Sequence, residues 1–160
     1  MMTPKIITSN AILVIGLKDN LTFITNAQGT GDLARQFMPR LNQIKNRVST
    51  QKLSIQIYHD FDYAKMTPNT TFEKWVGVEV SNFDTVPQNM ATLIIKKGLY
   101  AVFNYKGKPD GFFKAWQYIH TTWLPESGYS LDDRPHFEKL PEDYHPSNPE
   151  VEEQIWVPII

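Results

Sequence analysis

The sequence contains no cysteine among its 160 residues. This absence excludes a disulfide scaffold, a thiolate metal site and cysteine-based catalysis. An excess of either charge is also lacking, because 16 Lys and Arg residues are balanced by 17 Asp and Glu residues for a net charge of −1. The chain therefore lacks the basic surface that direct nucleic-acid binding or attachment to an acidic membrane requires.

Long apolar runs are missing as well. The longest, residues 11–17, is too short to span a bilayer. The first twenty residues do not combine the charged and apolar regions of a signal peptide. The sequence predicts a single cytoplasmic domain over residues 1–160, because this length can bury one hydrophobic core.

The common catalytic and metal-binding motifs do not occur. There is no G-x-S-x-G, no Walker loop and no H-E-x-x-H, and the four histidines form no pair at helical ligand spacing. His59 and His136 fall in corresponding predicted strands, but surface or hydrogen-bonded histidines are the simpler interpretation. We therefore expect neither a metal nor a cofactor.

Regular hydrophobic patterns are present in both halves of the chain. Alternating or β-branched runs predict strands at residues 10–18, 53–62, 74–80, 99–107, 136–140 and 154–159. Two segments with apolar residues at helical spacing predict helices. Asp32 is the expected N-cap of the first, within which Pro39 should cause a kink or weaken the early turns. Asp110 is expected to open the second, which runs to about Leu124.

These elements give the order strand–helix–strand–strand twice. Asp32 and Asp110 lie 78 positions apart, and Gly77 and Trp156 lie 79 apart. The spacing favours half-repeats at about 5–81 and 91–160, although many α+β domains can be cut into similar halves. The predicted fold is α+β, with duplicated βαββ units forming a pseudo-twofold antiparallel sheet, two main helices and a ligand groove at the joint.

Strand alternation also predicts a candidate site. If the aliphatic residues of each strand face the core, the residues between them face the other way: Tyr58, Trp75, Glu138, Gln154 and Trp156. Aromatic rings beside a carboxylate can hold a flat organic cation, with about 0.5–2 kcal/mol from each ring. Two alternatives stay open, namely a small second core under the loops and a reversal of the faces.

Several segments resemble the GyrI-like effector-binding domain family. They are "GLYAVFNYKGKPD", "WLPESGYSLDDRPHFEKL" and the terminal "EEQIWVPI". The family includes drug-binding domains of bacterial multidrug-responsive transcription regulators, and the chain also resembles its stand-alone members on integron gene cassettes. The resemblance implies the duplicated βαββ fold and a pocket for hydrophobic, often cationic compounds, with an acidic residue at its base.

The resemblance also assigns residues. The acidic position of the family falls on Glu138, and the aromatic position of the last strand falls on Trp156. A second family carboxylate falls on Gln154, so the negative charge should depend on Glu138 unless Glu152 or Glu153 compensates. The candidate ligand-binding set is completed by Trp75 and Tyr58, from the repeat alignment, and by Trp116 on the apolar stripe of the second helix.

The expected function is that of a binding module for hydrophobic, cationic small molecules, used in sensing or sequestration. One alternative is a small hydrolase with Glu138 as general base, although no second acid–base partner is evident. Another is a protein-interaction inhibitor of a topoisomerase, and a protein partner or a homodimer stays open. Because the sensor pattern begins within the first dozen residues, we expect no DNA-binding domain. A haem-binding role is disfavoured, since no histidine has a convincing axial position.

Overall fold

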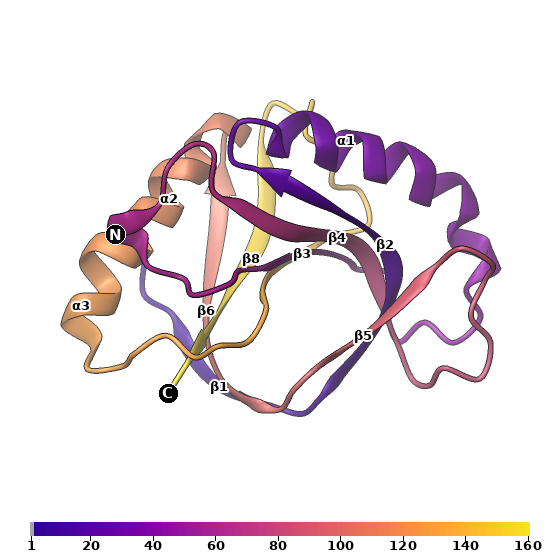
Figure 1. Cartoon of the computed structure of the whole chain (residues 1–160), viewed down its shortest axis with the longest axis horizontal. Helices are drawn as coiled ribbons and strands as arrows, with labels where there is room; N and C mark the ends of the chain where they lie inside the picture. Colours follow the sequence, from indigo (N-terminus) through magenta and orange to yellow (C-terminus); the bar gives the residue numbers. More distant parts are fainter. Residues whose placement is uncertain (1) are drawn as a thin grey trace.

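A computed structural model of the chain describes residues 2–160 as one antiparallel sheet with helices packed against it (Figure 1). The strands are β1 (Lys5–Ser9), β2 (Ile12–Thr22), β3 (Lys52–Ile57), β4 (Thr71–Val80), β5 (Ala91–Ile95), β6 (Gly98–Gly107), β7 (His136–Leu140) and β8 (Val151–Ile159). The main helical segments are α1 (Asn26–Phe37) and the run formed by α2 (Phe112–Tyr118), a π-helical turn (Ile119–Trp123) and α3 (Leu124–Ser127).

The strand order is symmetric about the pair of β3 and β7. The order β1-β6-β8-β7-β3-β4-β2-β5 places β7, β8 and β6 on one side of this joint and β3, β4 and β2 on the other. Helix α1 follows β2, and α2 follows β6, before the chain enters the central strands. The predicted α+β class and the duplicated βαββ order are confirmed.

Strand register shows which residues share a face of the sheet. Directly opposite residues lie on the same face, so Val76, Ser54, Glu138 and Ile155 form one row across β4, β3, β7 and β8. Val76 packs in a cluster with residues of α1, and Ile155 packs in a cluster with Ile119, which follows α2. Both helical segments therefore cover the face that carries Glu138, which we call the helix side.

The next row of residues lies on the opposite face. It consists of Trp75, Ile55, Phe137 and Trp156. These side chains belong to one buried cluster with residues from β2 and β5 at one end of the sheet and from β6 at the other. The two ends of the sheet can contribute to one cluster because the sheet curls around this face.

The first helix differs from its sequence prediction. It begins at Asn26, after Thr25, and Asp32 lies inside it, where its carboxylate pairs with Arg35. The predicted N-cap Asp32 is therefore wrong. The α-helix ends at Phe37, and Pro39 lies in the first turn of a 3₁₀ helix over Met38–Gln43, a position that tolerates its missing N–H.

The remaining elements match the predictions more closely. The second helical run continues to Ser127 and ends at Gly128, whose φ of 80° is in the left-handed region. Strand β3 ends at Ile57 rather than at residue 62. The edge strands β1 and β5, each 5 residues long, were not predicted.

Gly16 allows a close approach between β2 and β4. It lies opposite Gly77, and a Cβ atom added to Gly16 would lie 2.8 Å from the Cα of Gly77. Gly77 thus serves strand contact rather than leaving room for a ligand. Gly16→Ala is expected to lower the free energy of unfolding by about 2 kcal/mol, because a rigid backbone must move. Urea denaturation measures this change.

A glycine in a different setting provides the control for Gly16→Ala. A Cβ atom at Gly31 of α1 would meet only the end of the Arg35 side chain, at 3.3 Å. Gly31→Ala should therefore be neutral or stabilise by up to about 1 kcal/mol through helix propensity. Equal losses from both substitutions would show that the close approach of β2 and β4 is not the cause.

Candidate functional site

Aromatic rings gather on the helix side, near one end of the β3–β7 joint. Some come from the segments that follow β2 and β3. The others come from β4, from β7, and from α2 with the π-helical turn that continues it. The members of this aromatic cluster are Phe23, Tyr58, Phe61, Tyr63, Phe72, Phe113, Trp116, His120 and His136.

Phe61 links the two sides of the aromatic cluster. Its ring centroid is 5.1 Å from that of His136 in β7 and 4.9 Å from that of His120 in the helical run. Trp116 lies 4.7 Å from His120 on the same run. The segment after β3 therefore fills the space between β7 and the second helical run with its own aromatic side chain.

Glu138 lies on the same face as this cluster and is 8% exposed. The side-chain amide of Gln56 donates a hydrogen bond of 3.0 Å to its Oε1 atom. Burial raises the pKa of Glu138, while the charge of Lys74 and hydrogen bonds from Gln56 and Ser54 lower it. Burial, and then the charge of Glu138, raise the pKa of Tyr58. The carboxylate is thus electrostatically coupled to a ring of the cluster.

Two further charged groups are buried near Glu138. Glu153 is 6% exposed, and burial together with the charge of Glu138 raises its pKa to about 8, against the opposing effect of Lys74. Lys74 is 3% exposed, and burial lowers its pKa while the two carboxylates raise it. We refer to Glu138, Glu153 and Lys74 as the charged trio.

The predicted ligand-binding residues do not all lie together. Tyr58 and Trp116 belong to the aromatic cluster, on the face of Glu138. Trp75 and Trp156 lie on the opposite face with Phe137. The prediction that Glu138 and Trp156 share a face is wrong, because Glu138 is paired with the aliphatic residue next to Trp156.

The residues on the opposite face have local partners. The indole N–H of Trp75 donates to Glu73 over 2.6 Å, and that of Trp156 donates to Gln154 over 3.2 Å. Gln154 therefore does not remove a negative charge from the helix side. The second carboxylate on that side is Glu153, which was considered from the sequence as a compensating acid.

Strand alternation contained a signal for the face of Lys74, which the sequence interpretation missed, and also for the face of Glu153. Lys74 alternates with Val76 and Val78, so it belongs to the face that packs against α1. Glu153 alternates with Ile155 in the same way. No pattern predicted that Phe61 would fold back onto the helices, because it follows a strand in an irregular segment.

Two cavities lie next to these groups. One, of about 220 Å³, is lined by Tyr58, Asp60, Phe61, Leu131, Asp132, Asp133, Arg134 and His136. The other, of about 540 Å³, lies between the 141–150 loop and the strands that flank it, and Glu153 and Tyr144 are among its lining residues. Three members of the aromatic cluster, Tyr58, Phe61 and His136, therefore line the smaller cavity, and Glu153 of the charged trio lines the larger one.

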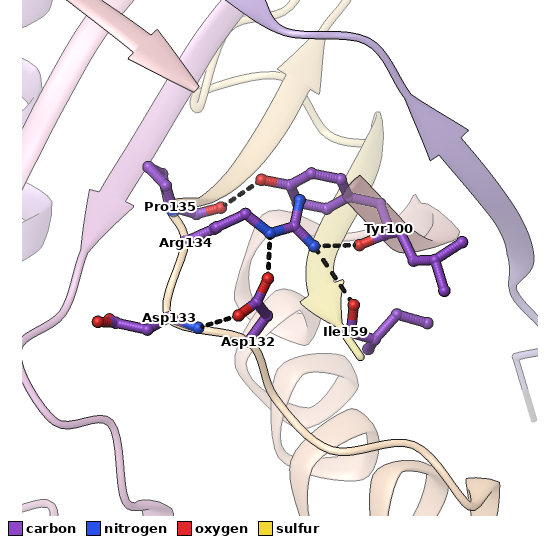
Figure 2. Close-up of polar contacts among 7 residues, drawn as sticks. Tyr100, Asp132, Asp133, Arg134, Pro135 and Ile159 are labelled. Atoms are coloured by element: carbon purple, nitrogen blue, oxygen red, sulfur yellow. Dashed lines mark hydrogen bonds and ion pairs between the residues drawn. The ribbon is translucent and has the colours of Figure 1, made fainter. Parts of the chain in front are cut away.

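Arg134, which lines the smaller cavity, makes several polar contacts with its neighbours (Figure 2). Its Nε atom donates to Asp132 over 2.5 Å, and its terminal nitrogen donates to the carbonyls of Leu99 and Ile159 over 2.5 and 3.3 Å. The guanidinium also lies 4.5 Å from the ring centroid of Tyr100. These contacts fix the segment that precedes β7 against the first residues of β6 and the last residues of β8.

The buried His120 predicts a specific pH dependence. Burial lowers its pKa from 6.5 to about 4, so the unfolded state takes up a proton first as the pH falls. The stability contributed by neutral His120 is present above pH 6.5 and is lost toward pH 4. The wild type should lose this stability as the pH falls, whereas His120→Leu should not. The difference in free energy of unfolding between variant and wild type should therefore shift by about 2 kcal/mol in favour of the variant from pH 7 to pH 5.

Urea denaturation at both pH values measures this gain. Comparing the variant with the wild type at each pH cancels the contributions of Glu138 and Glu153, which oppose that of His120. His59→Leu, at an exposed histidine, is the control substitution. A stability difference for His120→Leu that stays constant from pH 7 to pH 5 would contradict the proton linkage.

Within residues 2–160, no helix combines the length and apolar character needed to cross a bilayer. The same part of the chain contains no group of three or more His, Asp or Glu side chains arranged to hold a metal ion.

Comparisons with known proteins agree with this fold. The family model of the GyrI-like small molecule binding domain matches residues 2–160. Among solved structures, SAV2435 bound to tetraphenylphosphonium has a TM-score of 0.74 at 15% identity, covering 99% of this chain and 94% of its own. The EcmrR C-terminal domain has a TM-score of 0.73 at 15% identity, covering 100% and 98%.

A third similar structure is an integron cassette protein from the mobile metagenome of Vibrio cholerae. Its TM-score is 0.68 at 13% identity, covering 99% of this chain and 96% of its own. A search of curated proteins gives no significant match. At these identities the solved structures establish the fold, whereas the family model establishes the family.

Proposed function

Because the chain belongs to the GyrI-like small molecule binding domain family, we propose that it binds hydrophobic organic cations on the helix side of its sheet. The observation that carries the proposal is a buried carboxylate, Glu138, on the same face as a cluster of aromatic rings. Ring faces attract cations, and a desolvated carboxylate supplies a charge-selective attraction.

Ligand binding requires the aromatic cluster to open. Phe61 occupies the space between His136 and His120, so a bulky ligand would replace this ring and stack against Tyr58 and Trp116. The cavity of about 220 Å³ borders both Tyr58 and Phe61 and provides an approach from solvent. Trp75, Trp156 and Gln154, on the opposite face, would support the sheet rather than contact the ligand.

Two ions of the same shape and opposite charge test this proposal. Tetraphenylphosphonium and tetraphenylborate can be titrated separately while tryptophan fluorescence is recorded. Tetraphenylphosphonium should bind at least about tenfold more tightly, because the site carries carboxylates. Equal binding of the two ions, or tighter binding of the borate, would overturn the proposal.

The other predicted functions remain predictions. A hydrolase with Glu138 as general base would turn over a bound ester, and mass spectrometry would detect the product. Binding without product over a long incubation favours a module used in sensing or sequestration. A role as topoisomerase inhibitor requires a protein partner, which a pull-down with the purified enzyme would reveal.

A further inference from the structure

Lys74 is a buried lysine within a site proposed to bind cations. Its side chain is 3% exposed and lies in β4, on the helix side. Gln56 lies opposite Lys74 in the register and donates its hydrogen bond to Glu138. Lys74 is therefore the register partner of the residue whose amide binds Glu138, and the charges of Lys74 and Glu138 each shift the pKa of the other. Lysine is rarely this buried unless opposite charges accompany it.

The charged trio has one more acid than base. Glu138 and Glu153 both act on the ammonium group of Lys74. When all three groups are ionised, they carry one net negative charge. A ligand with one positive charge neutralises this excess. A ligand with two would leave a positive charge uncompensated in a site shielded from water, which is unfavourable.

We propose that Lys74 is a built-in cation that restricts the ligand to a single positive charge. This inference rests on the proposed function, since it concerns the charge that the same site accepts. Lys74 is then a specificity-determining residue. Glu138 is balanced by Lys74, and Glu153 supplies the charge that the ligand neutralises.

Proton release should accompany binding. Glu153 is electrostatically coupled to four titratable groups. Each either shifts the pKa of Glu153 or has its own pKa shifted by the charge of Glu153: Glu138, Lys74, Tyr105 and Tyr144. Because the pKa of Glu153 is about 8, this carboxyl group is largely protonated at neutral pH. A bound cation favours its ionised form, so affinity should increase as the pH rises through about 8.

Ethidium and propidium provide a matched pair of probes. They share a phenanthridinium ring, and propidium carries a second positive charge on its side chain. Dye fluorescence is titrated with the wild type and with Lys74→Met at about pH 8.5, where Glu153 is mostly ionised. The wild type should prefer ethidium. The substitution should tighten propidium binding about tenfold more than ethidium binding.

Lys18→Met is the control, because it makes the same chemical change outside the helix side. Lys18 lies 5.5 Å from the ring centroid of Trp75, a residue of the opposite face. This variant should leave the ratio of the two dye affinities unchanged. If Lys74→Met also leaves the ratio unchanged while the wild type binds ethidium, the inference is overturned. If the wild type binds neither dye and shows no preference for tetraphenylphosphonium over tetraphenylborate, the proposed function itself fails.

Glu153→Gln keeps the inference testable if Lys74→Met does not fold. This substitution leaves Glu138 and Lys74 as a neutral pair. Ethidium binding should weaken about tenfold and should no longer release a proton, as measured by titration calorimetry in buffers of different ionisation enthalpy. Unchanged ethidium affinity together with unchanged proton release would contradict the role of Glu153 and overturn the inference.

Discussion

Glu138→Gln is expected to weaken tetraphenylphosphonium binding about 100-fold, equivalent to about 2.7 kcal/mol. At about pH 8.5, where Glu153 is mostly ionised, the substitution leaves Lys74 and Glu153 as a neutral pair, so the site loses its excess negative charge. A glutamine side chain has nearly the same size and can still accept the hydrogen bond from Gln56. Tryptophan quenching or calorimetry measures the affinity.

The selectivity of Glu138→Gln is as informative as its affinity. The preference for tetraphenylphosphonium over tetraphenylborate should largely disappear, because the difference between the two ions is their charge. Glu152→Gln is the matched control, since Glu152 is an exposed carboxylate one residue from Glu153. It should change affinity by less than about twofold at moderate salt. Equal effects of the two substitutions would contradict a specific role for Glu138.

Arg134→Ala is expected to lower the free energy of unfolding by about 3 kcal/mol. Its side chain is 6% exposed, and its loss removes the donors to Asp132 and to the carbonyls of Leu99 and Ile159 (Figure 2). Three acceptors then lose a partner, and the ring of Tyr100 loses the guanidinium that lies 4.5 Å away. Urea denaturation followed by fluorescence measures the change.

Two variants distinguish the loss of the Arg134 hydrogen bonds from the loss of a positive charge. Arg134→Lys keeps the charge but cannot reproduce the planar fork, so it should recover less than half of the lost stability. Arg35→Ala removes an arginine that is 70% exposed and pairs with Asp32. It should cost less than about 1 kcal/mol. A loss from Arg134→Ala no larger than that from Arg35→Ala would contradict the structural role.

The fold could be predicted from the sequence because its main elements have strong local patterns. Strand alternation and helical spacing identified six of the eight strands in β1–β8 and both helical segments. The two edge strands were not predicted from the sequence. Each is short and pairs with one neighbour, β1 with β6 and β5 with β2. The start of α1 was misplaced because Asp32 resembles an N-cap, whereas its carboxylate instead pairs within the helix.

The candidate site could be predicted only in part. Glu138 was identified by the family resemblance, and Tyr58 and Trp116 lie with it on the helix side. Trp156 was assigned to the same face because the sequence does not show how β7 and β8 are paired. A shift of one residue in register moves a side chain to the other face. Lys74 was overlooked because an isolated lysine in a strand usually reaches solvent.

A crystal structure of the complex with tetraphenylphosphonium tests the central claim most directly. The ligand should lie on the helix side, between Tyr58 and Trp116 and near Glu138, with the ring of Phe61 moved from its place beside His136. A ligand bound on the opposite face of the sheet, against Trp75 and Trp156, with the charged trio untouched, would contradict the proposed site.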